Sequence, residues 1–393
     1  MVCEPESGSV SSIEQGLPPV PEWSGVQERN PQAPPLAERR KTRAVKVGNV
    51  TIGGGAPVSV QSMTITKTDD WAATIDQIQK LADAGCEIAR VSVPDPKAAA
   101  ACKKIKEGSP LPLVADIHFD HRFALAAIDA GWDKLRLNPG NIRDAQKVRE
   151  VVKAAQARSM PIRIGVNNGS LAPDIVQRYG HTPEGMVESG LRHIRILEEL
   201  DFRDIVVSLK AHDVRTTVAA YRLMATKVDY PFHLGITEAG TMRSGTVKSA
   251  VGLGILLAEG IGDTIRISLT ADPIEEVPVC WDLLKSLGLR ERGVEITSCP
   301  SCGRVQIDIV KLAEEVEKIT AEYRAPVKVA VMGCAVNGPG EASMADVGIA
   351  GGKGMGLIYR DGVMVRSLPE AQLLGGLREE IEKVIVERYP EYR

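Results

Sequence analysis

From about residue 43 to residue 290, short apolar runs alternate with stretches in which apolar residues recur every three or four positions. The longer stretches predict amphipathic helices, such as Thr74–Ala84, Arg122–Ala130, Asp144–Arg158, Pro183–Glu199 and Val214–Lys227. The short runs predict eight strands, which are Val58–Met63, Glu87–Val93, Leu113–His118, Lys134–Asn138, Ile162–Asn167, Ile205–Lys210, Phe232–Thr237 and Thr264–Leu269. Eight evenly spaced strand–helix units predict an α/β fold, a TIM (β/α)8 barrel, with an open doubly wound sheet as the alternative.

The two ends of the chain differ from this central part. Residues 1–40 are rich in Pro, Ser and Glu and lack apolar periodicity, so we expect a disordered tail before a barrel domain at 41–290. Residues 291–393 show strand, loop, helix, strand, loop and then further strands with a final helix, which predicts a smaller α+β domain. Its segment Gly351–Gly356 lacks the spacing of a phosphate-binding loop, so we expect a glycine-rich turn there.

Polar residues occupy alternate positions toward the C-terminal ends of the predicted strands, so they should face the barrel interior. Because that interior is normally apolar, we expect these side chains to bind a ligand. They are Arg90, Arg136, Asn138, Arg163, Asn167, Ser208, Lys210, His233, Thr237, Arg266 and Ser268. Four arginines and a lysine around one pocket would repel one another, and guanidinium groups suit phosphate oxygens, so a phosphorylated small molecule is predicted. The alternative for any single residue is an internal salt bridge, such as Arg136 with Asp116.

The titratable candidates for proton transfer at the same rim are Asp116, His118, His233 and Glu238. Glu238 directly follows the seventh predicted strand, where the small residues of Gly235–Gly240 leave room for a ligand. This position favours Glu238 over His233, which could equally be a histidine of the core.

Three cysteines in the C-terminal part have the spacing of metal ligands. Cys299 and Cys302 form a Cys-x-x-Cys pair, and Cys334 lies in a Gly/Pro-rich loop where the backbone can approach an inorganic group. No fourth cysteine follows, so one ligand position is left for an oxygen donor or a substrate. This pattern favours a working cluster, and structural zinc in an interaction module is the alternative.

Composition and net charge indicate the cellular location and the partners to expect. The seven cysteines are scattered and no secretory signal precedes them, which indicates free thiols and a cytoplasmic location. A net charge of −3 gives no reason to expect nucleic acid or a membrane surface as a partner. No apolar run is long enough to span a bilayer.

Several segments together resemble the 4-hydroxy-3-methylbut-2-enyl diphosphate synthase family in its two-domain bacterial form, over about residues 43 to 390. They are Arg90–Asp95, Leu135–Ile142, Gly165–Ser170, Val207–Lys210, His233–Gly240, Cys299–Arg304 and Gly333–Glu341. The resemblance implies a ferredoxin- or sulphite-reductase-like iron–sulfur domain after the barrel. It also implies reductive ring opening and dehydroxylation of 2-C-methyl-D-erythritol 2,4-cyclodiphosphate to 4-hydroxy-3-methylbut-2-enyl diphosphate, a step of non-mevalonate isoprenoid biosynthesis.

The resemblance further implies a 4Fe–4S cluster held by Cys299, Cys302, Cys334 and Glu341. A carboxylate is the weaker ligand to such iron, so we expect Glu341 to be exchangeable. Electrons should come singly from an external carrier, flavodoxin or ferredoxin, and Glu238 should donate the proton to the departing oxygen. A pterin-dependent barrel transferase, which would need no cluster, is the alternative.

Chain direction adds an expectation about assembly. The helical segment after the eighth strand should end at the bottom of the barrel, and a short connection at 288–293 leads into the cysteine domain. We therefore expect a head-to-tail homodimer in which each cysteine domain serves the partner's barrel mouth.

Overall fold

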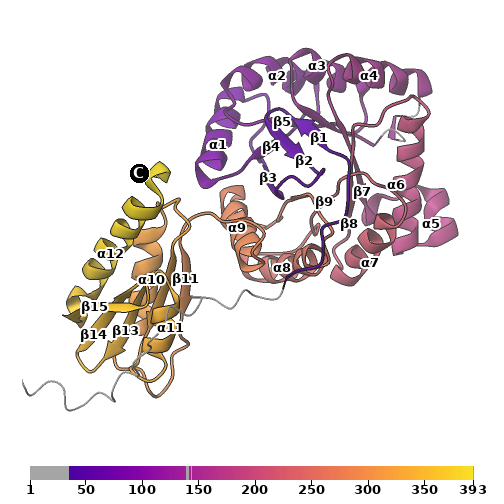
Figure 1. The fold of residues 1–393 in the computed structure, drawn as a ribbon. Coiled ribbons are helices and arrows are strands. Elements are labelled where there is room, and N and C mark those ends of the chain that lie inside the picture. The colour runs from indigo at the N-terminus through magenta and orange to yellow at the C-terminus, as the bar shows by residue number, and fades with distance from the viewer. Residues whose placement is uncertain (1–34, 139–140, 143, 393) are drawn as a thin grey trace, which may run out of the picture. The chain divides into compact units, whose positions relative to one another are not determined.

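The computed structural model describes residues 35–138, 141–142 and 144–392. These residues belong to two compact units, one spanning Leu36–Glu291 and one beginning at Arg292 (Figure 1). Within the described ranges, no helix has both the length and the apolar character that crossing a membrane requires.

The first unit is built on eight parallel strands, arranged side by side in the order β8-β7-β6-β5-β4-β3-β10-β9. A parallel bridge between Val207 and Phe232 joins the two ends of this row and closes the ring. The predicted TIM barrel is therefore confirmed, with all eight strands in their predicted places. They are β3 (Ser59–Met63), β4 (Ile88–Ser92), β5 (Leu113–Asp116), β6 (Lys134–Arg136), β7 (Ile162–Asn167), β8 (Ile205–Lys210), β9 (His233–Leu234) and β10 (Thr264–Ile265).

Helices surround the strands of this unit, as Figure 1 shows. They are α1 (Trp71–Ala84), α2 (Pro96–Gly108), α3 (His121–Asp129), α4 (Ala145–Ala157), α5 (Pro173–Tyr179), α6 (Pro183–Glu198), α7 (Val214–Ala225), α8 (Met242–Ala258) and α9 (Glu276–Ser286). Several begin at an aspartate whose carboxylate accepts a backbone N–H of the first turn, namely Asp70, Asp95, Asp120, Asp144 and Asp213. Such N-caps fix where each loop at the mouth ends and its helix begins.

A hairpin that the sequence analysis did not predict covers the opposite end of the barrel. Strands β1 (Val45–Val47) and β2 (Val50–Ile52) pair antiparallel. The buried side chains of Val47 and Ile52 pack against Ile88 and Val114, near the starts of β4 and β5. The hairpin thus supplies an apolar floor at the N-terminal ends of the strands.

The segment before this hairpin differs from the prediction of a tail extending to residue 40. The N–H of Ala37 donates to the carbonyl of Ala258 at 3.2 Å. The guanidinium of Arg40 lies 4.0 Å from the centre of the Phe232 ring and donates to the carbonyl of Val228 at 2.7 Å. Residues 36–40 are therefore part of the barrel unit, while residues 1–34 of the predicted tail lie outside the described residues.

The second unit is a five-stranded mixed sheet, which agrees with the predicted α+β domain. Its strands, in spatial order, are β11 (Glu295–Ser298), β12 (Lys328–Met332), β13 (Val347–Gly352), β14 (Met355–Arg360) and β15 (Val363–Pro369). The first three run parallel, and the last two continue the sheet antiparallel. The predicted glycine-rich turn lies between β13 and β14, where Gly354 has a φ of +69°.

Alternating side chains of this sheet form two apolar layers. Val329 and Val331 face helices α10 (Ile309–Thr320) and α12 (Leu373–Arg388). Ala330 and Met332 face the other side, where they pack with Ala342 of the short helix α11 (Gly338–Met344). The sequence analysis assigned this last segment to a loop, so the predicted ligand Glu341 lies on a helix instead.

Candidate active site

The barrel interior is lined by cationic side chains, as the alternation of polar residues predicted. Arg163 is 1% exposed, Lys210 is 7% exposed and Arg136 is 9% exposed. Arg90 and Arg266 are half-buried beside them. These side chains come from different strands and meet because all the strands run in the same direction toward one rim.

Part of this charge is neutralised inside the protein. Asp116 accepts a hydrogen bond from Arg136 Nη1 at 3.2 Å and lies 3.6 Å from Arg90 Nε. Glu276, at the start of α9, pairs with Arg266 at 3.2 Å. Burial alone would raise the pKa of Asp116, but the guanidinium groups of Arg90 and Arg136 bring it below its usual value. The internal salt bridges considered in the sequence analysis therefore exist.

Arg163 and Lys210 form no salt bridge within the described residues, although the charge of Asp116 acts on Arg163. Arg163 Nε and Nη1 are buried without a hydrogen-bond partner. Burial, followed by the charges of Arg163 and Arg90, lowers the pKa of Lys210 well below its usual value. Burial, followed by the charges of Arg90 and Arg136, also lowers the pKa of Arg163. An anion with several oxygens, placed among these groups, would relieve both the desolvation and the repulsion.

Two glycines leave room for these cations. A Cβ at Gly165 of β7 would lie 2.6 Å from Arg136 Nε, and one at Gly235 would lie 2.5 Å from Lys210 Nζ. Any larger residue would therefore press on a cationic group of the pocket. Glycine at these two positions leaves the space that the side chains of Arg136 and Lys210 occupy.

The other predicted residues fall into two groups. Asn138 is buried and holds the backbone of Gly165, donating to its carbonyl and accepting its N–H, both at 2.8 Å. Ser208 and His233 are also buried, and neither ring nitrogen of His233 has a partner among the described residues. The half-buried side chains near the C-terminal ends of the strands are Asn167, Thr237 and Ser268.

The candidate acid Glu238 is exposed and has a φ of +53°. A non-glycine residue in this left-handed region costs free energy, and such residues concentrate at active sites. His118, the other candidate at the rim, is exposed as well, and its charge contributes to the lowered pKa of Asp116.

In the second unit, the cysteines gather at one edge of the sheet. Cys299 directly follows β11, and Cys334 follows the neighbouring parallel strand β12, so both lie at the same strand ends. The N–H of Gly333 donates to Cys299 Sγ at 3.2 Å. A hydrogen bond to Cys302 and the charges of Cys302, Cys334 and Cys299 raise the pKa of the Arg304 guanidinium. All three thiols are therefore within electrostatic reach of one arginine.

The surroundings of Cys302 and Cys334 favour the ionised form of their thiols. The backbone N–H and then the side chain of Arg304 lower the pKa of Cys302. The backbone N–H of Asn337 does the same for Cys334. Among the described residues, no three His, Cys, Asp or Glu side chains are grouped closely enough to hold one metal ion.

Comparison with known proteins identifies the family. The model of the GcpE TIM-barrel domain matches residues 42–281, and that of the GcpE protein C-terminal domain matches residues 295–383. The chain belongs to the GcpE family. A relative from Geobacter sulfurreducens, 4-hydroxy-3-methylbut-2-en-1-yl diphosphate synthase (flavodoxin), is 60% identical over 89% of this chain and 100% of its own length. The synthase of the same name from Geobacillus thermodenitrificans is 57% identical over 90% of this chain and 95% of its own length.

The predicted family is thereby confirmed. Neither relative is a pterin-dependent transferase or a zinc module, so those alternatives are not supported. The two family models together match both units of the chain.

Sequence reasoning missed some polar groups inside this GcpE barrel. Lys134 and Gln61 are completely buried, and their polar side-chain atoms have no hydrogen-bond partner among the described residues. Lys134 lies two residues before Arg136, and Gln61 two residues before Met63, so the alternation along β6 and β3 could have indicated both. Glu276 was missed because it lies on a helix, ten residues after the arginine that it pairs with.

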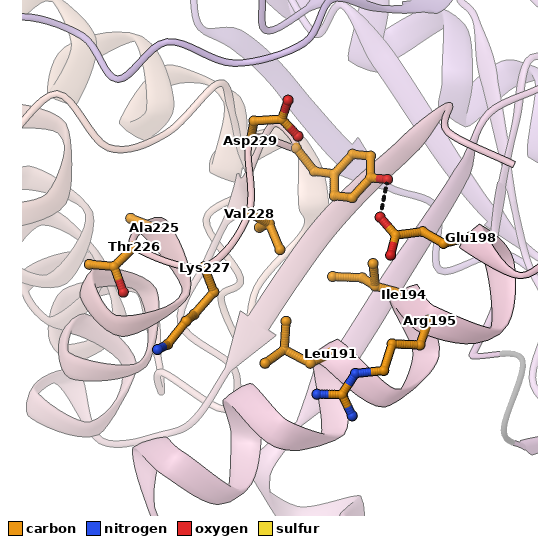
Figure 2. Close-up of a pocket in the computed structure, with 10 residues that line it drawn as sticks. Leu191, Ile194, Arg195, Glu198, Ala225, Thr226, Lys227, Val228 and Asp229 are labelled. Carbon is orange, nitrogen blue, oxygen red and sulfur yellow. Dashed lines mark hydrogen bonds between the residues drawn. The ribbon is translucent and has the colours of Figure 1, made fainter. Parts of the chain in front are cut away.

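A groove of about 470 Å³ between α6 and α7 is unrelated to this site (Figure 2). It is lined by Leu191, Ile194, Arg195, Glu198 and residues 225–230, and Tyr230 donates to Glu198 across it at 2.7 Å. Residues 228–230 lie three to five residues before the start of β9, so the groove lies toward the N-terminal ends of the strands. None of the predicted site residues lines it.

Proposed function

We propose that this chain is a 4-hydroxy-3-methylbut-2-enyl diphosphate synthase. It converts 2-C-methyl-D-erythritol 2,4-cyclodiphosphate to the open-chain product, using two electrons delivered by flavodoxin. The observation that carries the proposal is the excess of buried positive charge in the barrel, around Arg163 and Lys210. Only a compact polyanion would satisfy so many donors at once, and a cyclic diphosphate is one.

Substrate binding uses the cations that lack full internal partners. Arg163 and Lys210 supply charge-assisted hydrogen bonds to phosphate oxygens, and Arg90 and Arg136 complete the ring while Asp116 fixes their orientation. Asn138 supports the strand that carries Gly165, which keeps the space for Arg136. The diphosphate is thus held from several strands, which presents the ring C–O bond to be broken at the rim.

Two C–O bonds of the substrate are broken, and their oxygens leave in different ways. The oxygen of the ring C–O bond stays on the diphosphate, whereas the hydroxyl on the neighbouring carbon leaves as water and needs a proton, which we assign to Glu238. Glu238 lies at the rim four residues after β9, its side chain is exposed, and its φ is +53°. The two electrons supplied to the substrate leave the two carbons joined by a double bond.

Cys299, Cys302, Cys334 and Glu341 would hold a 4Fe–4S cluster, which when bound supplies single-electron transfer and a Lewis-acidic iron. The remaining described cysteines, Cys86, Cys102 and Cys280, are buried and form no disulfide.

The connection between the units supports a head-to-tail homodimer. Arg290 follows α9 and donates to the carbonyl of Val58 at 2.7 Å, and it pairs with Glu87 at 3.0 Å. Val58 and Glu87 precede β3 and β4, so Arg290 is held at the end of the barrel opposite the mouth. Strand β11 begins five residues later, within about 18 Å of extended chain. A dimer in which each barrel mouth binds the cysteine edge of the partner subunit is compatible with this short connection.

The experiment is anaerobic purification followed by an assay with reduced flavodoxin and the cyclic diphosphate. We expect a brown protein that contains iron and sulfide and that forms 4-hydroxy-3-methylbut-2-enyl diphosphate. A colourless protein that turns over, or a cluster-loaded protein that leaves this substrate unchanged, would contradict the proposal.

A further inference from the structure

Lys134 is a buried cation to which the mechanism above gives no role. It opens β6 and is 0% exposed, and its Nζ has no hydrogen-bond partner among the described residues. In the sheet register its Cα pairs with Val114, whereas Arg136 pairs with Asp116 and with Arg163. Lys134 therefore lies one inward-facing position deeper in the barrel than the row of Arg136, Asp116 and Arg163.

The groups around Lys134 are positive or neutral. The charges of Arg163 and Arg90 act on it, and its own charge in turn acts on His233. The carboxylate of Asp116 is already used by Arg90 and Arg136. Hydrogen-bond partners among the described residues are also missing for Arg163 Nε and Nη1 and for both ring nitrogens of His233. Apart from one nitrogen of the neutral His233 ring, which is an acceptor, these unpartnered atoms are donors, and none of them pairs with an anion among the described residues.

Structural packing does not account for a lysine here. Val114, its neighbour in register, belongs to the apolar cluster that Val47, Ile52 and Ile88 form at the floor of the barrel. A methionine or leucine would continue this layer without desolvating an ammonium group. A buried ammonium group without a partner lowers stability, and a bound anion would offset that cost.

We propose that Lys134 is a phosphate-binding residue at the inner end of the barrel pocket. Its ammonium group and Arg163 would hold oxygens of the substrate's diphosphate from the inner side. The identity of the ligand rests on the proposed function, whereas the anion site itself rests on Lys134, Arg163 and His233. The pocket would then reach below the ring of arginines that the sequence pattern revealed.

The test is Lys134→Met, with Lys46→Met, an exposed lysine of β1, as the matched control. Binding of the cyclic diphosphate and of inorganic diphosphate is measured by calorimetry, and the unfolding midpoint is measured without ligand. We expect the Kd of Lys134→Met for the cyclic diphosphate to rise at least tenfold. Its midpoint without ligand should stay level or rise, because an unpaired buried charge has been removed. Lys46→Met should change neither quantity.

A Lys134→Met protein with a lowered midpoint and a Kd within twofold of the parent would show a structural lysine and overturn the proposal. Should the methionine variant fail to fold, Lys134→Gln is judged by the same two measurements. If the parent binds inorganic diphosphate but not the cyclic substrate, the proposed function fails. The role of Lys134 is then still decided by the effect of the variant on inorganic diphosphate.

Discussion

Replacing Gly165 with alanine should impair substrate binding without touching any charged residue. The added Cβ would lie 2.6 Å from Arg136 Nε and 3.1 Å from Nη2, whereas ordinary van der Waals contact begins at 3.4 Å. The guanidinium must therefore move by about 0.8 Å, the difference between 3.4 and 2.6 Å. It cannot do so freely, because it donates to Asp116 at 3.2 Å and to the Gly165 carbonyl at 3.0 Å.

Two costs follow from this displacement. Overpacking of a buried site typically lowers the free energy of unfolding by about 1–3 kcal/mol. Misplacing a charge-assisted contact to phosphate costs about 1.5–3 kcal/mol of binding, which raises the Kd roughly 10- to 150-fold. The affinity loss is the more specific effect, because it comes from the geometry of Arg136 alone.

The assay is calorimetric titration of folded Gly165→Ala protein with the cyclic diphosphate. Gly254→Ala on α8 is the control, since its Cβ would lie 3.7 Å from the nearest atom, Leu283 Cδ1. This control should bind the substrate like the parent. Unchanged affinity in folded Gly165→Ala would refute the reasoning that Arg136 is held in place for the ligand.

Three further predictions concern the cluster, the N-terminal segment and protonation. Glu341→Cys should give a cluster that survives air longer but supports almost no turnover, because the exchangeable ligand is gone; parental activity with normal air sensitivity would argue against this role. Arg40→Ala should lower the free energy of unfolding by about 2 kcal/mol in urea titrations, because the cation over Phe232 and its carbonyl contacts are lost; no change would mean that residues 36–40 do not stabilise the barrel. The pKa of Lys210 lies well below its usual 10.5 in the folded protein without ligand, so the folded state binds fewer protons than the unfolded chain. The free energy of unfolding should therefore rise with pH from the lowered pKa of Lys210 up to about 10.5. Diphosphate binding should then take up protons, and a binding enthalpy independent of the buffer's ionisation enthalpy would contradict this.

The barrel could be predicted because its strands are short apolar runs at regular intervals, and this signal survives even where β9 and β10 are two residues long. The β1–β2 hairpin was missed, since three-residue strands carry too little periodicity to be distinguished from a loop. The packing of Arg40 was missed for a related reason. Its contribution comes from one aromatic ring and a few carbonyls, and composition does not register such contacts.

The candidate site was predictable where alternation along a strand fixed the inward face, as for Arg90, Arg136 and Arg163. The partners of these cations were less accessible, because Glu276 approaches from a helix and its role depends on tertiary packing. Lys134 was overlooked because the lower part of a parallel barrel is expected to be apolar. The helical setting of Glu341 was hidden by the glycines and proline around it, which predict a loop by propensity.

We propose that the cationic barrel of one chain and the cysteine unit of its partner form one active site. The test is to mix Lys210→Ala with Cys299→Ala, two variants chosen to be inactive alone, and to measure flavodoxin-driven product formation after subunit exchange. In a shared site each heterodimer has one intact pair of units, so random pairing should restore about a quarter of the parental activity. If exchange is confirmed and no activity returns, the barrel and the cysteines work within one chain and the claim is wrong.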